Sequence, residues 1–93
     1  MTFSWDVRKN AFLRKERGVS VERVVVAIEC GDILAVLEHP RPAFHPRQRF
    51  YVVEVDGYAW VVPFRDQERT RVLITAYPSR KYTRRYLKGG DES

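Results

Sequence analysis

The chain has 93 residues, a formal net charge of +5 and a hydrophobic content of 44%. This length accommodates one hydrophobic core, and the apolar content excludes a disordered basic tail. We therefore expect one folded domain over residues 1–88 and a frayed tail over residues 89–93. Its cationic surface should attract RNA, DNA, an anionic membrane or an acidic partner segment.

Cysteine content and hydropathy bear on where the protein resides. A single cysteine, Cys30, excludes an intramolecular disulfide and hence a stapled secreted scaffold, and we expect it to be a small buried residue. The N-terminus has no basic segment leading into an apolar one, and no window approaches the ~20 apolar residues of a membrane span. These features predict a cytoplasmic protein without a membrane partner.

Two helices are predicted near the N-terminus, after a short segment, Phe3–Trp5, that suits an edge strand. Asp6 can cap a helix over residues 7–17, which Gly18 ends. Ser20 can cap a second helix, which ends before Gly31. Apolar residues recur in it at helical spacing, at Val21, Val24, Val25 and Ile28.

Four strands are predicted over residues 33–38, 49–55, 58–64 and 71–77. The first is a short apolar run, and a loop stiffened by three prolines follows it over residues 40–48. Asp56-Gly57 predicts a two-residue β-hairpin turn. Its register pairs Val55 with Tyr58, Val53 with Trp60, Tyr51 with Val62 and Arg49 with Phe64 on one face.

The C-terminal part of the chain closes the predicted fold. A charged turn over residues 66–69 precedes the last strand, Pro78 ends that strand, and Ser79 caps a helix that extends to about Leu87. The fold class is therefore α+β, with two N-terminal helices, a four-stranded, mainly antiparallel sheet and a C-terminal helix.

Positive charge is segregated in the C-terminal part. Residues 69–90 contain seven basic side chains and no acidic one. On the last helix the basic residues fall at i and i+4, so they repel one another unless an anion binds. We assign RNA contacts to Lys9, Arg71, Arg84 and Arg85. The alternative is a solvated basic face anchored by Tyr82 and Tyr86.

Aromatic residues are interleaved with these basic residues. Tyr51, Tyr58, Trp60 and Tyr77 would suit stacking on unpaired bases. The alternative, which the large apolar area of aromatic side chains favours, is that Tyr51, Val53, Trp60 and Val62 form the core.

The side chains available favour RNA chemistry without a metal. One cysteine and two histidines form no cluster with zinc spacing, and no carboxylate cluster indicates a two-metal nuclease, so we predict no metal and no cofactor. RNA can be cleaved when a base deprotonates the 2′-OH, cations stabilise the charge on phosphorus and an acid protonates the leaving oxygen. Glu38 or His39 could be the base, and a histidine or tyrosine the acid. Arg49, Arg80 and Lys81 could form the phosphate clamp.

Three blocks of the sequence resemble the BrnT family of bacterial type II toxins, which share a RelE-like ribonuclease fold. The first runs from Phe3 to Lys9 and is followed by Gly18-Val19-Ser20, the second is Arg49-Phe50, and the third runs from Arg80 to Arg85. The sequence departs from the family pattern at Leu13, Arg17, 38–48 and 77–79.

The resemblance implies an endoribonuclease toxin with a RelE-like fold. By match to the family's blocks it implies functional roles for Lys9, Arg49, Arg80 and Lys81, whereas Glu38 and His39 rest on the chemistry above. It also implies a cognate ribbon-helix-helix antitoxin, through which alone the protein would join operator DNA. Two alternatives are a non-catalytic module that binds RNA or DNA, and an inactive domain retained only to bind a partner protein. The RNA sequence preference and ribosome dependence are not predicted.

Overall fold

The computed structural model describes residues 2–38, 43–44 and 48–87, which form three helices and six strands. The elements in chain order are β1 (Thr2–Trp5), α1 (Val7–Arg17), α2 (Val21–Glu29), β2 (Ile33–Glu38), β3 (Gln48–Val55), β4 (Tyr58–Gln67), β5 (Thr70–Leu73), β6 (Tyr77–Pro78) and α3 (Arg80–Tyr86). His39, most of the prolyl loop and the tail over residues 89–93 lie outside the described residues.

Capping residues set the ends of α1 and α2 as the sequence predicts. The Asp6 side chain accepts hydrogen bonds from two backbone amides of the first turn of α1, and Gly18 ends the helix in the left-handed conformation, at a φ of 71°. Ser20 caps α2 through a hydrogen bond from the Arg23 amide. Both predicted helices are therefore confirmed.

A buried asparagine fixes the angle between these two helices. Asn10 on α1 accepts a hydrogen bond from the Val21 amide at 2.8 Å and donates one to Glu22 Oε1 at 2.9 Å. The bond from Asn10 holds the pKa of Glu22 below its ordinary value. Because Asn10 is only 6% exposed, the start of α2 is fixed against α1 by a polar contact inside the core.

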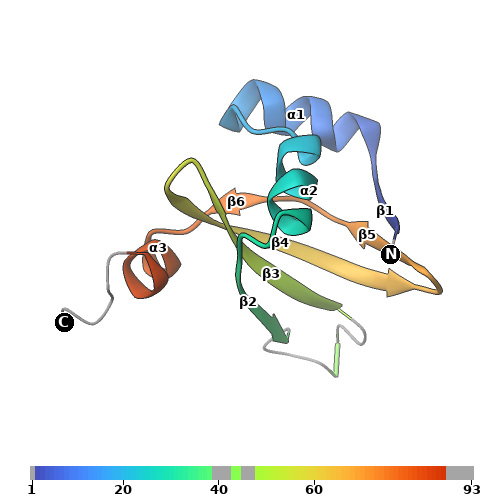
Figure 1. Cartoon of the computed structure of the whole chain (residues 1–93). Coiled ribbons are helices and arrows are strands. Elements are labelled where there is room, and N and C mark those ends of the chain that lie inside the picture. The colour runs from blue at the N-terminus through green and yellow to red at the C-terminus, as the bar shows by residue number, and fades with distance from the viewer. Residues whose placement is uncertain (1, 39–42, 45–47, 88–93) are drawn as a thin grey trace.

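The sheet has the strand order β1-β5-β4-β3-β2, and β6 pairs with the other end of β4 (Figure 1). β1 runs parallel to β5, and the remaining pairs are antiparallel. The hairpin of β3 and β4 has the predicted register, from Val55 opposite Tyr58 to Arg49 opposite Phe64. The Asp56-Gly57 turn has positive φ at both residues, as a two-residue turn of this type requires.

The predicted number of strands and their order among the helices are wrong. The described part of the chain has six strands in place of four; β1, which precedes both N-terminal helices, is the edge strand expected over Phe3–Trp5. β4 continues to Gln67, so Asp66 lies in a strand and the turn is shorter than predicted. The predicted strand 71–77 is split into β5 and β6. Pro63 explains the split, because it has no amide hydrogen to continue the ladder and only its carbonyl bonds to Ile74.

The C-terminal helix α3 is fixed to the hairpin by Thr83. Its buried hydroxyl accepts a hydrogen bond from the Ala59 amide and donates one to the Ser79 carbonyl. Ser79 caps the helix, as predicted, by accepting from the Tyr82 amide. None of the helices within the described ranges has the length and apolarity needed to cross a bilayer.

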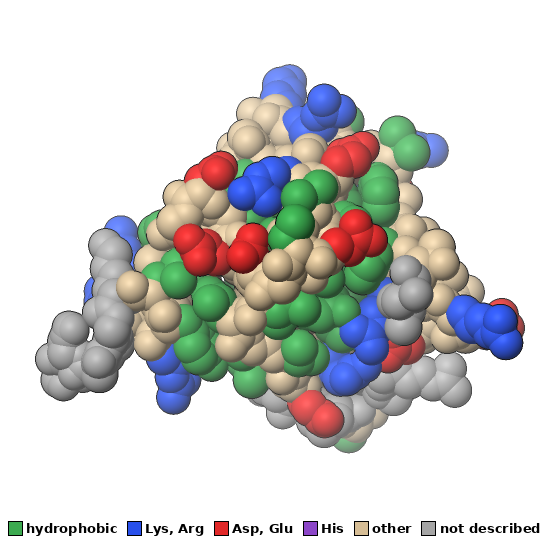
Figure 2. Space-filling model, viewed as in Figure 1, with side chains coloured by type: hydrophobic (Ala, Val, Ile, Leu, Met, Phe, Trp, Pro, Cys, Tyr) green, Lys and Arg blue, Asp and Glu red, His purple; other side chains and the backbone are tan. Residues whose placement is uncertain are grey.

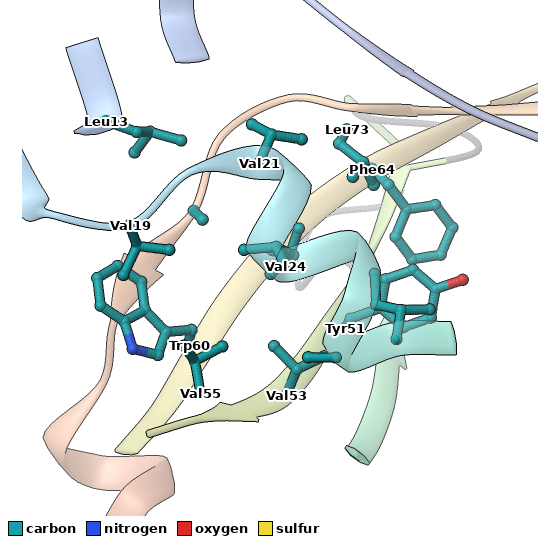
Figure 3. Packing of buried hydrophobic residues seen from close by; sticks show 14 residues of the cluster. Leu13, Val19, Val21, Val24, Tyr51, Val53, Val55, Trp60, Phe64 and Leu73 are labelled. Atoms are coloured by element: carbon teal, nitrogen blue, oxygen red, sulfur yellow. The ribbon is translucent and has the colours of Figure 1, made fainter. Parts of the chain in front are cut away.

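The main core lies between α1, α2 and one face of the sheet, which we call the helix-side face. Figure 3 shows Trp60 beside Val19 at one end of this core and Phe64 beside Tyr51 at the other. Tyr51 and Trp60 are buried, which confirms the core alternative for these two aromatic residues. Cys30 is exposed, contrary to expectation, because it follows the last buried position of α2, Ile28.

Candidate functional site

Strand register brings Glu38 and Arg49 together on the helix-side face. Glu38 at the end of β2 is the cross-strand partner of Arg49, and Arg49 is the partner of Phe64 on β4. Directly opposed residues in an antiparallel pair project from the same face, with Cβ atoms about 4.5–5.5 Å apart. Glu38 and Arg49 are thus neighbours on this face, although the guanidinium of Arg49 is directed toward β4, where it contacts Asp66 and Phe64.

Asp66 on β4 joins Arg49 to a second arginine. Its Oδ2 lies 2.7 Å from a terminal nitrogen of Arg49, and its Oδ1 lies 2.8 Å from Nε of Arg71 on β5. The sheet places all three residues on the helix-side face, since Asp66 is the register partner of Arg71. One carboxylate therefore holds two guanidinium groups of neighbouring strands, and the group of three has a net charge of +1.

Two aromatic rings support these guanidinium groups. The ring of Phe64 is completely buried, and the guanidinium carbons of Arg49 and Arg71 lie 5.1 and 4.9 Å from its centroid. Tyr51 stacks on Phe64 with 4.4 Å between ring centroids, and its hydroxyl accepts a hydrogen bond from Arg71. Cation–π contact and hydrogen bonding thus restrain both arginines.

The surroundings of Asp66 and Arg71 favour the charged form of both groups. Desolvation alone would raise the pKa of Asp66, but the hydrogen bonds from Arg49 and Arg71 outweigh it, so the pKa lies below its ordinary value. Burial alone would lower the pKa of Arg71, but the contacts with Tyr51 and Asp66 raise it overall. We call Glu38, Arg49, Tyr51, Asp66 and Arg71 the arginine cluster.

The arginine cluster unites three of the residues that the sequence singled out. Glu38 and Arg49 were predicted to act in catalysis, and Arg71 was predicted to contact RNA. His39 follows Glu38 in the chain but lies outside the described residues. Both histidines fall in undescribed segments, so metal independence stays a prediction.

The structure does not bring Arg80 and Lys81 to Arg49. Helix α3 is attached to β4 at Ala59, whereas Arg49 pairs with Phe64, five residues further along the same strand. At about 3.4 Å per residue, these two attachment points are about 17 Å apart. Arg80 lines a separate cleft with Tyr58, Thr83 and Arg84. A single phosphate site formed by Arg49, Arg80 and Lys81 is therefore not what this fold assembles.

The remaining predicted RNA contacts lie apart from the cluster. Lys9 is exposed on α1, and Arg84 and Arg85 are exposed on α3. Figure 2 shows Lys and Arg side chains at separate places over α1, near α3 and at the β4–β5 end, with acidic side chains between them. The positive charge is thus distributed around the molecule in this view.

Sequence reasoning missed Asp66 and assigned Tyr51 only to stacking or the core. The pattern that could have identified Asp66 is the alternation of side chains between the two faces of β4. Trp60, Val62 and Phe64 share one face, and if the strand continues past Phe64, Asp66 lies on that face as well. The charged stretch after Phe64 indicated a turn instead. The link between Arg49 and Arg71 therefore became visible only with the sheet.

Comparison of the chain with protein-family models and with curated proteins finds no significant match to either. The resemblance to the BrnT toxins therefore stays a prediction from the three sequence blocks.

Proposed function

We propose that this protein is a metal-independent endoribonuclease, a toxin of a type II toxin–antitoxin pair that inhibits growth by cleaving RNA. The observation that carries the proposal is the arginine cluster, in which Asp66 and the ring of Phe64 restrain the guanidinium groups of Arg49 and Arg71, and Glu38 is the cross-strand neighbour of Arg49. A proton acceptor beside a fixed cationic clamp is what cleavage through the ribose 2′-OH requires.

Glu38 is the proposed general base. It is exposed at the end of β2, so a bound RNA strand can reach its carboxylate. Glu38 takes the proton of the 2′-OH, the 2′ oxygen attacks the adjacent phosphorus, and the bond from phosphorus to the 5′ oxygen breaks. The products are a 2′,3′-cyclic phosphate and a 5′-hydroxyl end. DNA has no 2′-OH and is not a substrate.

Arg49 and Arg71 are the proposed phosphate clamp. Each guanidinium carries five N–H donors, and the contacts to Asp66 and Tyr51 leave donors on both groups for a phosphate oxygen. Because Asp66 and the ring of Phe64 already restrain them, little side-chain entropy is lost when substrate binds. Preorganised donors of this kind stabilise the charge that develops on phosphorus.

The proton donor to the leaving 5′ oxygen is assigned by sequence alone. His39 adjoins Glu38 in the chain, and histidine titrates near neutral pH. We assign it this role in preference to Tyr51, which is 3% exposed and accepts a hydrogen bond from Arg71.

The partner is proposed from the family resemblance. A ribbon-helix-helix antitoxin would neutralise the toxin in the cytoplasm and carry it to operator DNA. Binding should therefore protect cells, and the toxin alone should not bind operator DNA specifically.

The test is incubation of the purified protein with RNA and with DNA of the same sequence, in EDTA. The proposal predicts that RNA alone is cut and that its new ends are a 2′,3′-cyclic phosphate and a 5′-hydroxyl. Binding of both nucleic acids without cleavage would favour the alternative of a non-catalytic module. A strict metal requirement with a 3′-hydroxyl product would exclude the mechanism.

A further inference from the structure

The face of the sheet opposite the main core carries a groove that the arginine cluster does not use. It has a volume of about 320 Å³ and lies between β3, β4, β6 and α3. Val61 and Pro63 contribute from β4, Phe50 from β3 and Gln48 from the start of that strand. Tyr77 of β6, the N-cap Ser79 and Tyr82 of α3 complete the lining.

Three of these side chains are aromatic, and they come from three different elements. Phe50 and Tyr82 are half-buried, and Tyr77 is 41% exposed although it pairs with the buried Val61. Tyr82 also stacks on Tyr86, with 5.9 Å between ring centroids. The aromatic rings are thus held by the sheet and by α3 while part of their surface stays open to solvent.

Polar and cationic groups border the aromatic rings. The amide of Gln48 can donate and accept hydrogen bonds at one end of the groove, and Arg65 is its cross-strand partner. At the other end the ammonium of Lys81 lies 5.3 Å from the centroid of the Tyr82 ring. A ligand in the groove would therefore meet ring faces and one amide, with a cationic residue next to the lining at each end.

We propose that this groove binds one unpaired nucleobase of a single-stranded RNA. Aromatic rings between cations are the combination with which proteins hold unpaired bases and the phosphates that flank them. The volume lies at the lower end of the range for small-ligand sites, so it suits one base with its sugar better than a peptide helix. An acidic peptide would use the cations but would leave the open aromatic faces without a planar partner.

This inference rests on the proposed function for the identity of the ligand and deepens it by placing base recognition away from the scissile phosphate. Gln48 and Arg49 are consecutive on β3 and project to opposite faces. A strand of RNA that passes around this end of the sheet could thus occupy the groove and the arginine cluster together.

The experiment measures the affinity of short single-stranded oligoribonucleotides whose 2′-hydroxyls are methylated, because these cannot be cleaved. Tyr77→Ala should weaken binding roughly 5-fold to 100-fold, the range expected for loss of stacking on one base. Tyr77→Phe keeps the ring and should bind as wild type does. Phe12→Ala removes an aromatic side chain that is 54% exposed on α1 and should leave affinity unchanged.

Unchanged affinity of Tyr77→Ala would overturn the proposal. The proposal would also be overturned if this protein did not bind RNA but bound an acidic peptide in a way that depends on Tyr77. That result would assign the groove to a protein partner. If Tyr77→Ala lowers the melting temperature strongly, Tyr77→Leu replaces it, because leucine keeps apolar bulk without a ring. Tyr77-dependent RNA binding without cleavage by the wild type would support the groove while contradicting the proposed function.

Discussion

Asp66 is the residue on which the geometry of the candidate site depends. A carboxylate that bridges two arginines fixes both guanidinium groups and removes one unit of the charge that would drive them apart. Asp66→Asn keeps the size of the side chain but removes the charge. We expect this variant to lose RNA cleavage more than RNA affinity, because the guanidinium groups remain but are no longer aligned. Equal losses of rate and affinity would contradict a positioning role.

The same ion pairs give stability a definite pH dependence. Because the pKa of Asp66 is lowered in the folded protein, its contribution is present above its ordinary pKa of 3.8 and is lost as the pH falls through the folded value. The melting temperatures of wild type and Asp66→Asn should differ at neutral pH and converge below about pH 4. A difference that persists unchanged at lower pH would show that the ion pairs are not its source.

Arg49 and Arg65 lie on neighbouring strands, and Arg65 provides a control for the substitution of Arg49. Arg49 belongs to the cluster, whereas Arg65 is exposed on the opposite face of the sheet. Loss of one preorganised donor typically costs about 10²–10³ in rate. Arg49→Ala should therefore reduce cleavage by about that factor, while Arg65→Ala should change mainly affinity and its salt dependence. Similar single-turnover rates for the two variants would refute the placement of the site.

Sequence reasoning could name single residues of the site but not all of their contacts. Arg49 and Glu38 were identified by a family block and by chemistry, but neither was predicted to lie next to the other. Their pairing follows from the register of β2 and β3, which depends on a loop whose length and prolines do not specify a register. Asp66 was assigned to a turn and not to the site, because charged residues after Phe64 are more typical of a turn than of a strand.

Among the elements, α2 depends on Asn10 for its position against α1. Replacing Asn10 by Leu leaves the buried Val21 amide without a partner, and an unsatisfied buried donor costs about 1–3 kcal/mol. Urea denaturation should show a loss of that size, whereas Lys15→Ala on the exposed side of α1 should be nearly neutral. A loss below about 0.5 kcal/mol for Asn10→Leu would mean that the hydrogen bond is not important for the packing.

The position of α3 depends on one hydroxyl in the same way. Thr83→Val keeps the shape of the side chain but leaves the Ala59 amide unsatisfied, while Thr83→Ser keeps the hydroxyl. Amide hydrogen exchange at Ala59 should accelerate in Thr83→Val and stay slow in Thr83→Ser. Equal exchange in the two variants would show that α3 is held mainly by other contacts.

The elements that sequence predicts best are those with local signals. Caps at Asp6 and Ser20 predict two helices, and Asp56-Gly57 predicts the hairpin and its register. The sheet edges have no such signal. β1 is positioned by parallel pairing with β5, more than sixty residues later in the chain. The division of the predicted strand 71–77 into β5 and β6 depends on its pairing with the part of β4 that contains Pro63.

At the scale of the whole molecule, RNA cleavage and base binding are assigned to opposite faces of the sheet. The helix-side face carries the arginine cluster at the end of the core, and the opposite face carries the aromatic groove. Because α3 lies near the groove and not near Arg49, its basic residues would serve RNA affinity and not the chemical step. This assignment corrects the sequence-based hypothesis that Arg80 and Lys81 share a phosphate site with Arg49.

The measurement that tests the central claim most directly is single-turnover RNA cleavage in EDTA by wild type, Glu38→Gln, Arg49→Ala and the double variant. If base and clamp act on one phosphate, each single change should slow cleavage by about 10²–10³, and the double variant should lose less than the product of the two factors. Full activity of Glu38→Gln, or no RNA cleavage by the wild type, would contradict the claim that the arginine cluster is a ribonuclease site.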